Sequence, residues 1–168
     1  MIQTPLAEVR TQPCIQAFGD AIQGLDASFR SLLACDPITF DTRPRNLPVE
    51  VVYLFSNGDR PIYVGRSNNF RQRLGNHCRN SSQTNQASLA FRLACEEMQH
   101  VRTKYQRGSS AANILKDVPG LFEAFNRMKL QMRSMEIRYV AEPDQVRQGL
   151  LEMYAALALG TKHDFGTH

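Results

Sequence analysis

The fold of this chain is decided by residues 49–79, which read VEVVYLFSNGDRPIYVGRSNNFRQRLGNHCR. β-Branched and aromatic residues dominate 49–55 and again 62–64, which is typical of strands. Between them, Asn57-Gly58 supplies the positive-φ positions that a tight turn needs. The segment therefore predicts an antiparallel β-hairpin.

The length of the turn decides which side chains of the hairpin share a face. A loop of Ser56 to Arg60 holds an odd number of residues, so Tyr53 and Tyr63 are expected on the same side of the sheet. Gly65 follows at a point where the second strand must pass close to a helix. This register is a prediction that the structure can test.

A helix is predicted directly after the hairpin. Ser67 or Asn68 can cap it, and it should run to about Cys78 with its apolar side toward the sheet. Arg73 and His77 are four residues apart on this helix and therefore share a face. By itself His77 is more often a satisfied core residue than a catalyst, and Arg73 alone would be a surface cation.

The rest of the chain is predicted to be mainly helical. Apolar residues recur every three or four positions from Ile15, which predicts one helix over 14–35, and prolines make 36–48 an extended linker. Downstream we expect a helix from Ala87 to about Val101, a short turn at 111–115, a helix from Pro119 to about Leu130, a strand at Met135–Tyr139, and a last helix from Pro143 to Leu159 that Gly160 ends.

Together these elements predict an α+β fold. A small antiparallel sheet of about three strands, with the hairpin first, is flanked by helices. Residues 1–47 form an N-terminal helix and a proline-containing linker, and residues 48–168 form the main domain, with a helical insertion between 80 and 132.

Composition predicts an ordinary globular protein. The 168 residues carry a net charge of +4, and the four cysteines have neither zinc-finger spacing nor C-x-x-C pairs. No apolar run is long enough for a signal peptide or a membrane span, so we expect a cytoplasmic protein. The cations concentrate in the acid-free residues 66–79, namely at Arg66, Arg71, Arg73 and Arg79. This cluster favours a polyanionic partner.

Glu152 is an isolated acid in the last predicted helix. Its neighbours include Leu150, Leu151 and Met153, and a helix that is apolar almost all round should be largely buried. A buried carboxylate is costly unless it meets a cation or a metal, so Glu152 is expected to have a partner. Equally, Glu152 can occupy a narrow exposed stripe as a good helix former.

The hairpin and the helix after it resemble the GIY-YIG nuclease family. The second signature of that family is matched by Tyr63-Val64-Gly65, and the first by Val51-Val52-Tyr53, which keeps only the tyrosine. Arg73 and His77 fall where the family has an arginine and a histidine, and Glu152 matches its metal-binding glutamate in order and context. Where many members have an asparagine, this chain offers His163 or Asp164.

The resemblance implies a Mg²⁺-dependent or Mn²⁺-dependent endonuclease acting on nucleic acid, with double-stranded DNA as the expected substrate. Its site would comprise Tyr53, Tyr63, Arg73, His77 and Glu152, with Glu152 binding one divalent ion. A tyrosine would orient or deprotonate the water and Arg73 would bind the scissile phosphate. Nucleic-acid contacts are expected at Arg66, Arg71, Arg79 and Asn69, the last at the start of its helix.

Two other interpretations stay open from the sequence. The first is a catalytically weak or inactive module of the same fold that binds nucleic acid without cutting it. The second is an interaction protein whose helices 14–35 and 85–132 bind a partner. Whichever of these functions the chain has, we also expect that it could form a homodimer or bind a partner protein through the N-terminal helix.

Overall fold

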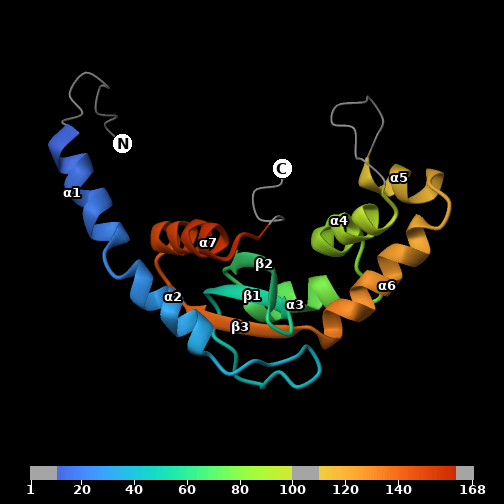
Figure 1. The fold of residues 1–168 in the computed structure, drawn as a ribbon, viewed down its shortest axis with the longest axis horizontal. Helices are drawn as coiled ribbons and strands as arrows, with labels where there is room; N and C mark the ends of the chain where they lie inside the picture. Colours follow the sequence, from blue (N-terminus) through green and yellow to red (C-terminus); the bar gives the residue numbers. More distant parts are fainter. Residues whose placement is uncertain (1–10, 100–109, 162–168) are drawn as a thin grey trace.

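The computed structural model describes residues 11–99 and 110–161, and its centre is a three-stranded antiparallel sheet (Figure 1). Strands β1 (Val51–Asn57), β2 (Arg60–Ser67) and β3 (Glu136–Ala141) have the spatial order β2-β1-β3. Strand β1 is therefore central, and β2 forms one edge. The predicted α+β fold, with the hairpin as its first part, is confirmed.

Helices cover both faces of this sheet. In the described residues they are α1 (Thr11–Ile22), α2 (Leu25–Ala34), α3 (Phe70–Cys78), α4 (Ser88–Glu97), α5 (Ala111–Asp117), α6 (Leu121–Ser134) and α7 (Gln145–Leu159). Helices α2 and α7 pack on one face, whereas α3, with α4 and α6 beyond it, covers the other (Figure 1). The predicted helical insertion thus contributes α4, α5 and α6.

The prediction of one N-terminal helix over 14–35 is wrong, because the chain breaks between α1 and α2. Gly24 adopts a left-handed conformation with φ of 81°, which interrupts the helix. Nη1 of Arg147 donates to the carbonyl oxygens of Ala21 and Gln23. The guanidinium therefore satisfies helix-end carbonyls that a continuous helix would have used internally. The apolar spacing continues across the break, which explains why it predicted a single helix.

Several predicted boundaries shift by a few residues. Helix α3 is capped by Asn69, whose side chain accepts a hydrogen bond from the N–H of Gln72, rather than by Ser67 or Asn68. Helix α6 begins after Gly120 and runs to Ser134. Helix α7 begins after Asp144, whose carboxylate accepts from two N–H groups of its first turn, and it ends at Gly160 as predicted.

The hairpin reaches the predicted register by an unexpected route. Only Gly58 and Asp59 separate the strands, so the turn alone would place Tyr53 and Tyr63 on opposite faces. A bulge at Ile62 restores the parity, because Ser56 pairs with Pro61 while Phe55 pairs with Tyr63. The two tyrosines therefore share a face, as predicted.

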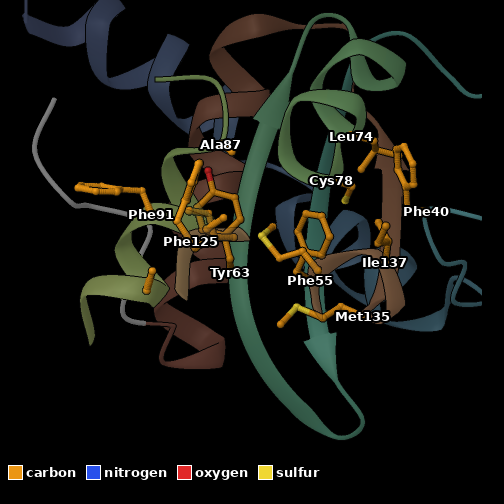
Figure 2. Packing of buried hydrophobic residues seen from close by; sticks show 14 of the residues in the cluster. Phe40, Phe55, Tyr63, Leu74, Cys78, Ala87, Phe91, Phe125, Met135 and Ile137 are labelled. Atoms are coloured by element: carbon orange, nitrogen blue, oxygen red, sulfur yellow. The ribbon is translucent and has the colours of Figure 1, made fainter. Parts of the chain in front are cut away.

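Each face of the sheet has its own hydrophobic core. The larger core includes Tyr53, Phe55 and Tyr63 from the hairpin together with residues of α3, α4 and α6, and Figure 2 shows part of this cluster. The second core joins Val52, Leu54 and Val64 to leucines and alanines of α2 and α7. Alternation along β1 thus anchors helices to both sides of one strand.

Helix α1 carries much of its apolar surface in contact with solvent. Ile15 and Phe18 are 70% and 57% exposed, although the helix contacts α7. A homodimer or a partner bound through this helix stays a prediction. Among the described residues, no helix combines the length and apolar character required to cross a bilayer.

Candidate active site

Two tyrosines on the hairpin form the floor of the site. Tyr53 and Tyr63 have ring centroids 6.0 Å apart, and both rings pack against the ring of His77 at the same distance. Tyr53 is fully buried, whereas Tyr63 retains 8% exposure. The two tyrosines therefore lie side by side as predicted, but they differ in access to solvent.

Gly65 makes room for this pair. Tyr53 pairs with Gly65 across the two strands, so the tyrosine side chain lies over a residue without a Cβ. A Cβ built at Gly65 would lie 2.6 Å from Cε1 of Tyr63 and 2.7 Å from the hydroxyl oxygen of Tyr53. Glycine is required here by the close approach of two aromatic side chains.

Replacing this glycine should disturb both tyrosines together. Gly65→Ala is expected to lower the free energy of unfolding by about 1–3 kcal/mol, because the added methyl group must displace a buried ring. Denaturant unfolding measures the loss. Gly19→Ala is the matched control, because nothing lies within 4 Å of the corresponding Cβ on α1. Equal stability of the two variants would contradict this account.

Helix α3 brings Arg73 and His77 to the first tyrosine. The hydroxyl of Tyr53 lies 3.0 Å from Nε2 of His77, and its oxygen accepts a hydrogen bond of 3.2 Å from Nε of Arg73. The two α3 residues are one helical turn apart, so a single helix face delivers both. The four predicted residues Tyr53, Tyr63, Arg73 and His77 thus meet in space.

Burial keeps this cluster uncharged at its centre. It raises the pKa of Tyr53 well above 10.0, and the nearby Tyr63 adds to the shift, while Arg73 opposes it. Burial also lowers the pKa of His77 well below 6.5, and the charges of Arg73 and Arg92 lower it further. At neutral pH, Tyr53 is therefore a neutral phenol and His77 a neutral imidazole.

The low pKa of His77 predicts a loss of stability in mild acid. The unfolded chain binds a proton at His77 below pH 6.5, whereas the folded chain does so only at a much lower pH. The free energy of unfolding should therefore fall with decreasing pH from 6.5 by up to about 1.4 kcal/mol per pH unit. His77→Gln, which cannot titrate, should show a correspondingly flatter dependence in urea titrations. Parallel curves for the two proteins would refute the assignment.

Glu152 reaches the site from the other face of the sheet. Helix α7 packs against β2 and β1 on the face opposite α3, but β2 is an edge strand, so the site forms around that edge. Oε2 of Glu152 lies 3.0 Å from Nε of Arg66, which follows Gly65 on β2. The expected cationic partner of Glu152 is therefore Arg66.

The expectation that α7 is largely buried is wrong. Met153 and Leu157 are 49% and 72% exposed, because α7 packs through one face only, which includes Leu151 and Ala155. The Glu152 side chain keeps 24% of its exposure. Glu152 therefore lies at the margin of the packed face. This position is intermediate between the two that the sequence left open, a buried carboxylate and an exposed stripe.

Gln148 fixes this part of α7 against the sheet. Its Nε2 donates to the carbonyl oxygens of Ser67 and Glu142, at 3.2 and 3.3 Å. Because both partners are acceptors, the amide nitrogen must face them, and Oε1 faces the other way. That oxygen is buried and has no hydrogen-bond partner in the described part of the chain. Gln148 precedes Glu152 by one helical turn.

One cleft connects these groups. It has a volume of about 1020 Å³, and its lining includes Tyr63, Arg66, Arg73, Arg92, Gln148 and Glu152. Tyr53 and His77 do not line it; they lie behind Tyr63 and Arg73, to which they are bonded or packed. The cleft therefore contains three arginines and one glutamate among its described lining residues.

Three other predicted nucleic-acid contacts lie outside the lining of this cleft. The Arg71 guanidinium donates to the carbonyl oxygens of Pro44 and Arg45 in the linker, Arg79 folds over Gly75, and Asn69 caps α3. Their nucleic-acid role stays a prediction without support from this cleft. His163 and Asp164, the candidates for the family asparagine, lie outside the described residues.

The sequence did not single out Arg92 or Gln148. Arg92 borders the apolar stripe of α4, and its guanidinium carbon lies 5.8 Å from the centroid of the Tyr63 ring. Gln148 lies in the same helix as Glu152, a helix that was expected to be largely buried, and it is 1% exposed, but only Glu152 stood out in the sequence. Only the helical spacing of Gln148 and Glu152, four residues apart, could have suggested a shared face.

The donors at the α7 side of the cleft suit a hard divalent cation. Glu152 supplies a carboxylate, and one turn away Gln148 has an amide oxygen without a partner. No group of three or more His, Cys, Asp or Glu residues gathers in the described ranges, as an all-protein cage would require. Magnesium commonly uses one or two carboxylates, waters and substrate phosphates instead.

Comparison with known proteins identifies the region that contains the hairpin, α3 and α4. Residues 50–109 match the family model described as the GIY-YIG catalytic domain. No curated protein and no solved structure gives a significant match to the chain. The match covers Tyr53, Tyr63, Arg73 and His77, whereas Glu152 lies beyond it.

Proposed function

We propose that this chain, whose residues 50–109 match the model of the GIY-YIG catalytic domain, is a metal-dependent endonuclease that hydrolyses phosphodiester bonds in DNA. Such a domain implies a phosphodiesterase of the nuclease type, which acts on nucleic acid. The proposal of metal-dependent DNA cleavage depends on one observation. Tyr63, Arg73 and Glu152 come from three separate elements and line the same cleft. A packing role alone gives no reason for these groups to converge.

Arg73 is the proposed ligand of the scissile phosphate. It lines the cleft, and its Nε is held by the Tyr53 hydroxyl, so the guanidinium is oriented before substrate arrives. A guanidinium fork can donate to two phosphate oxygens at once and stabilises the charge that grows on them during attack. Tyr53 positions Arg73 directly through this hydrogen bond, and His77 acts through Tyr53, to whose hydroxyl it is bonded.

Tyr63 is the tyrosine proposed to contact the attacking water. It lines the cleft, whereas Tyr53 is fully buried and already bonded to Arg73 and His77. A phenol gives up its proton reluctantly near neutral pH, so nearby cations are required for it to act as a base. Arg73 lines the cleft with Tyr63, and the guanidinium carbon of Arg92 lies 5.8 Å from the centroid of the Tyr63 ring.

Glu152, with the unpartnered Oε1 of Gln148, is the proposed holder of one Mg²⁺ or Mn²⁺ ion. When bound, such an ion would stabilise negative charge on the phosphate and on the leaving oxygen. Arg66 pairs with Glu152 and therefore neutralises its charge in the metal-free protein. The side chain of Arg66 is 48% exposed, so it is free to turn toward a phosphate.

A second candidate is a module of this fold that binds nucleic acid without cutting it. Under this candidate the Arg66–Glu152 pair stays in place when nucleic acid binds, and a glutamate held by an arginine does not serve a metal. The first signature of the family, which keeps only Tyr53, favours this candidate. The two candidates share the basic cleft and differ only in the chemistry at Glu152.

Supercoiled plasmid DNA separates the two candidates. The full chain is incubated with plasmid in EDTA, in Mg²⁺ and in Mn²⁺, and nicked and linear products are measured on gels. The nuclease predicts products only with a divalent ion. Salt-dependent binding to DNA with no cleavage in either metal would establish the binding module instead.

A further inference from the structure

Helix α4 supplies the cleft with a cation that the hairpin and α3 do not. Arg92 lines the cleft with Arg73, and its guanidinium carbon is 5.8 Å from the Tyr63 ring centroid. Its charge is also felt inside the site, where it lowers the pKa of His77. Arg92 therefore lies close to the reacting groups, although it comes from the helical insertion.

The position of Arg92 is set by a packed helix and not by a loop. Leu89 and Ala94 of α4 are fully buried, and the rings of Phe91 and Phe125 join α4 to α6 with centroids 6.3 Å apart. Arg92 is half-buried on the neighbouring face of the helix. Its backbone is therefore held as firmly as the core.

Helix α4 and the loop before it form a polar wall of the cleft. Arg92 shares this wall with Ser88, one helical turn earlier, and with Gln83, Thr84 and Asn85. Helices α4 and α7 stand on either side of β2 (Figure 1), so the cleft runs between them. Hydroxyl and amide groups of this kind contact phosphates and sugars in nucleic-acid complexes.

The charges in the cleft suit more than one phosphate. Arg66, Arg73 and Arg92 line it against one acid, Glu152, which gives a net charge of +2 among its described lining residues. Arg73 is the proposed ligand of the scissile phosphate, and Arg66 pairs with Glu152 in the metal-free protein. Arg92 is therefore a third cation of the cleft, and it comes from an element that carries neither the tyrosines nor Glu152.

We propose that Arg92 binds a phosphate of the nucleic-acid strand next to the scissile one, so that the α4 wall positions the strand across the tyrosine pair. This inference rests on the proposed function, because it takes nucleic acid as the ligand of the cleft. Binding one phosphate releases counterions, which makes affinity depend on salt in proportion to the number of contacts.

The test is DNA binding measured in EDTA, where no cleavage can occur. Fluorescence anisotropy of a short labelled duplex, at a series of KCl concentrations, gives the salt dependence of the binding constant. Arg92→Gln should reduce the slope of log K against log salt by about 0.9, the value for one phosphate contact. Arg92→Lys should keep the wild-type slope, because it keeps the charge.

Arg30→Gln is the matched control for the loss of one positive charge. Arg30 lies on α2, pairs with Asp26 and does not line the cleft. If Arg92→Gln binds DNA with the same slope and affinity as Arg30→Gln, the proposal is overturned. A wild-type protein that shows no salt-dependent binding also overturns it.

The outcome is separable from that of the proposed nuclease. Binding that depends on Arg92, in a protein that never cuts, would retain this inference and reject the nuclease. Metal-dependent cutting by a protein whose DNA binding ignores Arg92 would do the opposite. Thermal unfolding of each variant shows whether a change in DNA binding comes from the loss of a phosphate contact or from the loss of packing against Tyr63.

Discussion

Glu152→Gln is expected to slow metal-dependent DNA cleavage by about 1,000-fold or more. The change removes the carboxylate charge from the cleft, and an ion that stabilises the phosphate and leaving oxygen is worth several kcal/mol. The amide keeps the size of the side chain and its position on α7. Initial nicking rates in Mg²⁺, compared with wild type, measure the effect.

Folding cannot account for such a loss. The Arg66–Glu152 pair is partly exposed, and exposed ion pairs contribute about 0–1 kcal/mol to stability. Glu136→Gln provides the matched control, because Glu136 also pairs with an arginine, Arg138, at 3.0 Å but lies on β3 outside the cleft lining. Normal cleavage by Glu152→Gln would reject the assignment of the metal site.

A binding measurement independent of turnover strengthens the test. Free Mn²⁺ gives a strong electron paramagnetic resonance signal that weakens when the ion binds to protein. Wild type should bind Mn²⁺, and Glu152→Gln should bind it at least about tenfold more weakly, since charge attracts the ion. Arg66→Gln should bind it more tightly, because the competing guanidinium is gone.

The sequence predicted the sheet better than the helices around it. Alternation and turn chemistry in 49–65 predicted the hairpin and the shared face of Tyr53 and Tyr63. The actual turn is shorter, and a bulge at Ile62 supplies the missing residue. The outcome was right because one face of the strands must be buried, and burial constrains parity whatever the turn.

The prediction of a single helix over 14–35 was wrong because it relied on local sequence alone. Helical spacing is a local property, and it continues through Gly24 without interruption. The break is stabilised by Arg147, which lies more than 120 residues away in sequence and donates to Ala21 and Gln23. A contact of this range leaves no trace in the spacing of apolar residues.

In the candidate site, too, residues placed by local structure could be predicted, whereas residues placed by contacts between distant elements could not. Residues carried by the hairpin and α3 could be found from spacing, because one strand pair and one helix place them rigidly. Arg92 and Gln148 depend on how α4 and α7 dock against β2, and no sequence pattern encodes that docking. Burial of α7 was overestimated for the same reason, since composition does not tell how many of its faces are covered.

Arg73→Lys is expected to reduce cleavage by about 100- to 1,000-fold while keeping the charge of the cleft. Lysine cannot reproduce the fork that holds two phosphate oxygens, and it has no Nε donor for the hydroxyl of Tyr53. Nicking rates and DNA affinity should therefore separate, with affinity nearly unchanged. Arg30→Lys, on α2 and outside the cleft lining, should cut at the wild-type rate. Equal rates for the two variants would show that Arg73 acts through charge alone.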